Sequence, residues 1–144
     1  MPVGGVGRAG PKPGSVEATL EQAVGWLLPG SAPVVALTDP ADDVLLVGLA
    51  ATHRVLGPVL AAIDGGALQV SAAAADQAAS SHEEALSWCL KVETKLLEIS
   101  SWFEQAGGVD HLVVKGPAAA HLDALEPSLR SFADLDLLVP GSAI

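Results

Sequence analysis

Two carboxylates separated by a single residue, Asp134 and Asp136, are the side chains of this sequence best arranged to do chemistry. They lie in the segment Phe132 to Val139, where the alternation of residue types predicts a β-strand. In a strand, side chains at positions i and i+2 point the same way, with Cα atoms roughly 6.6 Å apart. Two acids so placed can hold a divalent metal ion next to a phosphate. The alternative is an edge strand whose acids face water, and the Asp-x-Asp pattern alone favours that simpler interpretation.

The two faces of this predicted strand differ in character. Leu138 is expected on the same face as the acids. The opposite face is expected to carry Leu135, Leu137 and Val139.

A glycine turn precedes the acid pair and is consistent with a phosphate site. The run from Val109 to Lys115 is mostly apolar and predicts a buried strand, and Gly116 would allow close approach of the backbone at its end. Pro117 suits the first position of a short helix, predicted to end near Leu122. The free N–H groups of that helix would point at a bound anion, and the ammonium group of Lys115 would add positive charge. Lys115 is alternatively a solvated lysine at a strand end.

The residues before this segment predict helices that support it. Ser15 is a suitable N-cap for a first helix. The dipeptide Asp39-Pro40 predicts an N-cap followed by proline at the first helical position. This second helix is expected to run to about Leu56, where the dipeptide Gly57-Pro58 would break or kink it and open a further short turn.

A longer helix is predicted in the middle of the chain. The Ala-rich stretch from Leu68 to Ala79 favours helix by propensity, and Ser81 with Glu84 matches a capping box that would begin a new one. Gly107-Gly108 would end this helix. The tryptophans are expected to pack in the core or between helices. The apolar seam of the long helix is predicted to consist of Ala85, Cys89, Val92, Leu96, Ile99, Phe103 and Ala106.

Length, charge and composition limit the possible classes of function. The 144 residues fit one domain, or a supporting region and the start of another. The formal net charge of −10 argues against nucleic acid and against an anionic membrane surface as partners. A single cysteine, Cys89, permits no internal disulfide and fits a reducing compartment. With no signal peptide and no spanning apolar run evident, we expect a soluble, cytoplasmic protein.

The segments KGPAAAHL and LRSFADLDLLVP, taken together, resemble the signature of the uncharacterised nucleotidyltransferase family, a branch of the polymerase-β-like nucleotidyltransferase superfamily. Upstream, LAATHRVLGPVLAAI is similar to the His-Arg-Val segment in the N-terminal helices of that family. The run FEQAGG is similar to the end of the helix that leads into its Lys-Gly strand. The resemblance covers about residues 40–143.

This resemblance implies transfer of a nucleotidyl group from a nucleoside triphosphate such as ATP to an acceptor hydroxyl, with Mg²⁺ or Mn²⁺. By the same resemblance, Asp134 and Asp136 would be the catalytic, metal-binding acids. Gly116 would be the turn glycine at the nucleotide phosphates, with Lys115 beside it. Arg130 corresponds to the arginine before the acid pair, where a phosphate contact is our hypothesis and an ion pair that holds the loop is the alternative.

The expected fold class is α+β: a tail over residues 1–14, a helical region over 15–106, and the first strand-helix-strand of a nucleotidyltransferase core over 109–144. The superfamily also uses a third carboxylate on a later strand, for which we can name no residue before Ile144. The chain is therefore expected to be incomplete as a catalyst. The alternative function is a non-catalytic fragment or pseudoenzyme that binds a protein partner through its helices, or that self-associates through an exposed strand.

Overall fold

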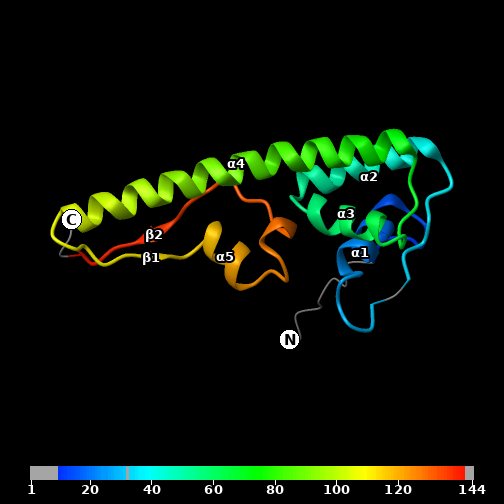
Figure 1. The fold of residues 1–144 in the computed structure, drawn as a ribbon. Coiled ribbons are helices and arrows are strands. Elements are labelled where there is room, and N and C mark those ends of the chain that lie inside the picture. The colour runs from blue at the N-terminus through cyan, green and yellow to red at the C-terminus, as the bar shows by residue number, and fades with distance from the viewer. Residues whose placement is uncertain (1–9, 32, 142–144) are drawn as a thin grey trace, which may run out of the picture.

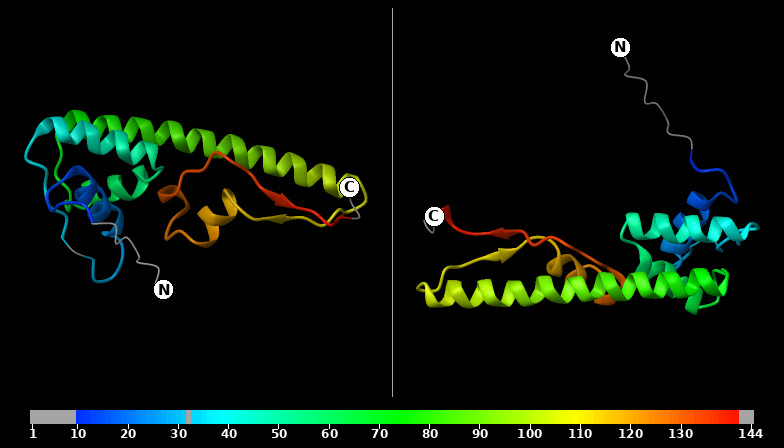
Figure 2. Two further views of the ribbon diagram at one scale, coloured as in Figure 1. Left: turned by 180° about the vertical axis from the view of Figure 1, so that it is seen from behind. Right: turned by 90° about the horizontal axis from the view of Figure 1, so that it is seen from above.

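One 34-residue helix, α4 (Ala72–Gln105), runs the length of the molecule in this computed structural model (Figure 1). Helices α2 (Pro40–Thr52) and α3 (Leu56–Asp64) pack against its N-terminal half, and α1 (Val16–Gly25) packs on α2 and α3. Two short strands and helix α5 lie along its C-terminal half in all three views (Figures 1 and 2). The structure describes residues 10–31 and 33–141, so most of the tail predicted over residues 1–14 falls outside it.

The first two helices begin where the sequence predicts. Ser15 caps α1, its side chain accepting a hydrogen bond from the backbone N–H of Ala18 at 3.3 Å. Asp39 caps α2 in the same way through the N–H of Ala41 at 2.9 Å, with Pro40 at the first position. Each cap satisfies a backbone donor that a helix leaves unpaired at its N-terminus.

The predicted end of the second helix is wrong. Helix α2 stops at Thr52, and Arg54 takes a positive φ of 58°, a conformation that ends helices. Helix α3 then begins at Leu56, so Gly57 lies inside its first turn. A Cβ on Gly57 would lie 2.5 Å from the carbonyl oxygen of Leu129, which shows that this glycine allows close packing rather than breaking a helix.

The capping box predicted at Ser81 is also wrong. Helix α4 is continuous from Ala72, and its N-cap is Ser71, which accepts from the N–H of Ala74 at 3.4 Å. Ser81 lies inside the helix, where its hydroxyl accepts from the side chain of Gln77. The alanine-rich turn favours helix by propensity and packs on the core, so nothing interrupts the helix there.

The apolar seam predicted for α4 is confirmed over most of its length. Cys89 is buried, and the other seam residues up to Phe103 are half-buried. Ala106 is exposed because it follows the last helical turn. Gly107 and Gly108 both take positive φ values, of 103° and 79°, and end the helix as predicted.

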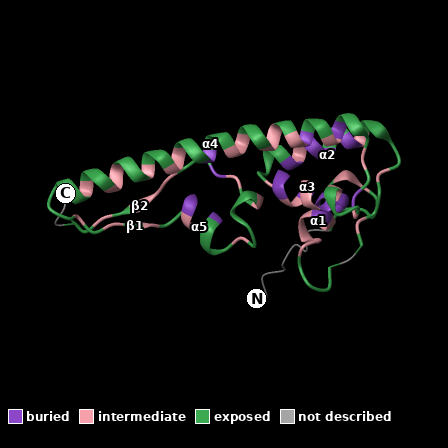
Figure 3. Cartoon of the chain, viewed as in Figure 1, coloured by how far each residue is buried: buried purple, intermediate pink, exposed green. Residues whose placement is uncertain are grey.

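The two halves of the molecule bury different amounts of apolar surface (Figure 3). The main core lies between α1, α2, α3 and the N-terminal half of α4, and its largest fully buried side chains include Leu46, Val59 and Leu68. A second, smaller cluster in the C-terminal half consists of Cys89, Ala120 and Phe132. Burial of apolar side chains therefore contributes less to the stability of the C-terminal half than to that of the N-terminal half.

The sheet is small and antiparallel. Strands β1 (Leu112–Val113) and β2 (Leu137–Leu138) pair with Leu112 opposite Leu138. The buried strand predicted from Val109 to Lys115 is wrong in extent and in burial, since Leu112 is 61% exposed and Val114 is 39% exposed. In the described part of the chain the sheet consists of these two strands, and no further element covers its outer face.

The fold is thus mostly helical with a small antiparallel sheet, which agrees with the expected α+β class. The division into a helical region and a nucleotidyltransferase core stays a prediction. Across residues 10–31 and 33–141, no helix has the length and apolar character that crossing a membrane requires.

Candidate functional site

The glycine turn and the acid pair lie against each other. Gly116 has a φ of 61° and a ψ of −112°, a conformation that side chains disfavour. A Cβ at this position would collide with the carbonyl oxygen of Asp134 and lie 3.4 Å from the ring of Phe132. Only glycine therefore allows the backbone of the turn to touch the backbone that carries the acids. Helix α5 (Pro117–Leu122) follows directly, with the predicted bounds.

Lys115 forms an ion pair with one member of the acid pair, Asp136. Its Nζ lies 2.9 Å from Oδ2 of Asp136, on side chains that are 63% and 46% exposed. The hydrogen bond to Asp136, the charge of Asp136 and then the charge of Asp134 raise the pKa of the Lys115 ammonium. Both carboxylates are therefore within electrostatic reach of one cation. Lys115 is thus an exposed lysine at the end of the strand that also pairs with Asp136.

The alternation predicted for the acid segment is seen only in part, and the paired strand is shorter than expected. Leu135, Leu137 and Val139 are half-buried and Asp134 and Leu138 are exposed, but Asp136 is half-buried like its two neighbours. Strand β2 covers only Leu137–Leu138, so the acids come directly before it. The carbonyl of Asp136 still accepts from the N–H of Val114 at 3.0 Å and extends the ladder by one bond.

Arg54 is a site residue that sequence reasoning did not assign. Its guanidinium lies 3.8 Å from Oδ1 of Asp134. It is also the one non-glycine residue with a positive φ in residues 10–31 and 33–141. Non-glycine residues in this conformation are uncommon, and they concentrate at functional sites. The signal available in the sequence was its place in the segment LAATHRVLGPVLAAI, which is similar to the His-Arg-Val segment of the nucleotidyltransferase family.

These groups border one cleft of about 710 Å³ between the α2–α3 junction and the glycine turn. Four of the five predicted site residues line it, namely Lys115, Gly116, Arg130 and Asp134. Asp136 does not line it, but it is tied to the cleft by its pair with Lys115. The apolar wall of the cleft includes Val24, Leu27, Leu28, Val55 and Leu129.

Arg130 lines this cleft without forming an ion pair to any carboxylate in the described part of the chain. Its backbone N–H bonds to the carbonyl of Pro127 and closes the 3₁₀ turn η1 (Pro127–Leu129). The alternative role for Arg130, an ion pair that holds the loop, is thus not observed. Its exposed guanidinium is open to an anion in the cleft.

A family model described as uncharacterised nucleotidyltransferase matches residues 39–144. The chain belongs to this family. The matched range begins at the N-cap of α2 and contains Arg54, the glycine turn and the acid pair, whereas α1 lies outside it. Neither a curated protein nor a solved structure matches the chain.

For a nucleotidyltransferase of this family, the acid pair offers donors for a divalent ion. Within the described ranges, no group of three or more His, Cys, Asp or Glu side chains is gathered so that it could hold a metal. Asp134 and Asp136 therefore provide two carboxylates, without a third such side chain gathered beside them in the described residues. Mg²⁺ is commonly bound through one or two carboxylates together with substrate phosphates, so the donor set fits a metal ion that arrives with a nucleotide.

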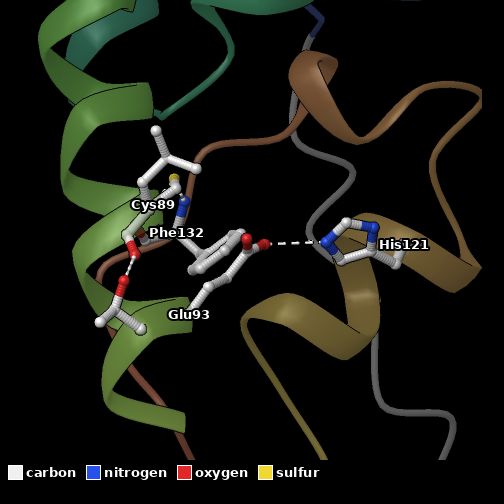
Figure 4. A network of polar contacts seen from close by, with 6 residues as sticks. Cys89, Glu93, His121 and Phe132 are labelled. Carbon is white, nitrogen blue, oxygen red and sulfur yellow. Dashed lines mark hydrogen bonds and ion pairs between the residues drawn. The ribbon is translucent and has the colours of Figure 1, made fainter. Parts of the chain in front are cut away.

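Two polar contacts fix the site segments to α4 (Figure 4). The thiol of Cys89 accepts from the N–H of Phe132 at 3.2 Å and donates to its carbonyl oxygen at 3.3 Å. On α5, Nε2 of His121 lies 2.8 Å from a carboxylate oxygen of Glu93. The first contact holds the chain two residues before Asp134, and the second holds the helix that follows the glycine turn.

Proposed function

We propose that this cleft binds a nucleoside triphosphate with a divalent metal ion, for transfer of the nucleotidyl group to an acceptor hydroxyl. The observation that supports this most is the convergence of Asp134, the glycine turn and three cations around one cleft, to which Lys115 ties Asp136. The chain carries a net charge of −10 and only seven Lys and Arg residues. Three of these seven, Arg54, Lys115 and Arg130, line this cleft.

Each residue has a definite part in the proposal. Asp134 and Asp136 hold the metal ion, which when bound neutralises phosphate charge for an in-line displacement. The flexible ammonium of Lys115 and the planar guanidinium of Arg130 contact phosphate oxygens. Gly116 lets the turn that carries Lys115 pack directly against the backbone of Asp134. The protein mainly positions the nucleotide and stabilises the charge of its phosphates.

A third carboxylate belongs to the full site that the superfamily resemblance implies. None of the described residues joins the acid pair in that position. The proposal for this chain is therefore a nucleotide-binding half-site, and its first test is binding rather than turnover.

Calorimetric titration with ATP and GTP in the presence of Mn²⁺ tests this proposal. We expect metal-dependent binding by the wild-type chain and a loss of roughly tenfold or more in affinity in Asp134→Asn/Asp136→Asn. The control, Asp64→Asn/Asp76→Asn, removes the same charge from exposed positions outside the cleft and should bind like wild type. A folded wild-type chain that binds neither nucleotide, or a site variant that binds normally, would contradict the proposal.

A second candidate function, binding of a protein partner through α4, has one observation in its favour. The tryptophans are expected in the core or between helices, but only Trp26 packs on the core, while Trp88 and Trp102 are more than half exposed. Leu90 and Leu97 are also exposed, one above the other on α4. Self-association abolished by Leu90→Glu/Leu97→Glu, in a chain that binds no nucleotide, would select this candidate.

A further inference from the structure

Each acid of the candidate site is already paired with a different cation. Asp136 pairs with Lys115 at 2.9 Å, and Asp134 pairs with Arg54 at 3.8 Å. The negative charges of the two carboxylates are thus balanced by the positive charges of two side chains. The proposed function leaves Arg54 without a role, although this residue joins the N-terminal helices to the acid pair.

The pair between Arg54 and Asp134 is suited to be exchanged. Its separation of 3.8 Å exceeds that of a hydrogen bond, and the two side chains are 56% and 59% exposed. Exposed ion pairs of this kind contribute about 0–1 kcal/mol. A bound cation can therefore replace the guanidinium beside the carboxylate at little cost.

The backbone of Arg54, by contrast, is held in place. A positive φ costs a non-glycine residue about 1–3 kcal/mol and persists where the surroundings enforce it. Here, Arg54 lies between two packed helices, and its backbone N–H bonds to the carbonyl of Ala51 at 3.1 Å. The close contact between Gly57 and Leu129 fixes the following helix against the C-terminal half. A fixed backbone with a loosely held guanidinium presents that group at one border of the cleft.

We propose that Arg54 is a phosphate-binding residue of this cleft, which pairs with Asp134 while the site is empty and with the phosphates of the nucleotide once Asp134 binds a divalent cation. This inference rests on the proposed function. The planar guanidinium suits two phosphate oxygens at once. When the carboxylates take up a divalent cation, Arg54 and Lys115 become surplus positive charge beside the cleft, and the phosphates balance that charge.

Two titrations of the full chain separate this role from a purely structural one. The first uses Mn²⁺ alone, and the second uses ATP with Mn²⁺. Arg54→Gly removes the guanidinium and suits the positive φ, so the variant should fold, which circular dichroism checks. We expect its affinity for ATP with Mn²⁺ to fall roughly tenfold or more, while Mn²⁺ alone binds as well as in wild type or more tightly, because Asp134 has lost a competing cation.

Two further variants sharpen the comparison. Arg54→Lys keeps the charge but not the planar fork, and we expect it to recover part of the nucleotide affinity. Lys95→Gln removes one positive charge from an exposed pair with Glu98 on α4, outside the cleft, and should change neither titration.

The outcomes distinguish this inference from the proposed function. If wild type binds ATP with Mn²⁺ and Arg54→Gly binds it equally well, the inference is overturned and the proposed function stands. If Arg54→Gly weakens Mn²⁺ alone as much as it weakens the nucleotide, Arg54 only positions Asp134, and the inference is again overturned. If wild type itself binds no ATP with Mn²⁺, the proposed function fails and the inference with it.

Discussion

The N-terminal and C-terminal halves of this molecule share helix α4 but are stabilised differently. The N-terminal half buries eleven residues of one apolar cluster between four helices. The C-terminal half buries three and leaves Leu112, Leu122 and Leu138 exposed. It is held instead by the thiol contacts at Phe132, the His121–Glu93 pair and the close backbone packing at Gly116.

The candidate site lies where these two halves meet. Arg54 comes from the well-packed helices, while Lys115, Gly116 and Asp134 come from the sparsely packed segment. A rigid region thus presents one cation to a segment that has few apolar contacts of its own. Local opening is easiest where few apolar contacts are buried, so we expect the acid segment to be less stable than the helices that face it.

The largest difference should come from truncating one leucine in each half. Leu46 is fully buried, and Leu46→Ala should lower the free energy of unfolding by about 2–5 kcal/mol. Leu138 is 59% exposed, and Leu138→Ala should change it by no more than about 0.5 kcal/mol. Urea denaturation followed by circular dichroism measures both. Equal losses would show that the exposed strand is covered in solution and would remove the contrast between the halves.

A smaller effect on stability, with a large effect on the site, is expected from the glycine turn. Gly116→Ala adds a Cβ that collides with the backbone of Asp134, at a φ that alanine disfavours. We expect a loss of about 1–3 kcal/mol and no measurable binding of ATP with Mn²⁺. Gly66→Ala is the matched control, because Gly66 also has a positive φ but no atom lies within 4 Å of the added Cβ. If both variants bind alike, the close approach at Gly116 does not shape the site.

A loss of stability similar to that of Gly116→Ala should come from removing the thiol that anchors the acid segment. Cys89→Ala removes both hydrogen bonds to the backbone of Phe132 and leaves two buried groups unpaired. We expect a loss of about 1–3 kcal/mol in the free energy of unfolding. Cys89→Ser keeps a donor and an acceptor at this place and should lose less. Amide hydrogen exchange at Phe132 should rise in the alanine variant, and unchanged exchange would assign the anchoring to apolar packing alone.

The sequence by itself determined the features that depend on neighbouring residues. The caps at Ser15 and Asp39, the seam of α4 and its end at Gly107-Gly108 follow from hydrogen bonds and periodicity within a few residues. The alternation expected around the acid pair holds only in part, because Asp136 is half-buried like Leu135 and Leu137. The family resemblance singled out the acids, the glycine turn and Arg130, and the fold brings these around one cleft, with Asp136 tied to it through Lys115.

Where local signals competed with packing, only the tertiary structure decided which of the two prevailed. A capping box at Ser81 is worth about 1 kcal/mol, which a continuous helix resting on the core outweighs. The meeting of Arg54 with Asp134 and of Gly57 with Leu129 joins residues far apart in the chain, and no local preference encodes such a contact. Whether an apolar strand is buried likewise depends on which layers cover it, and that is why Leu112 and Val114 are exposed here.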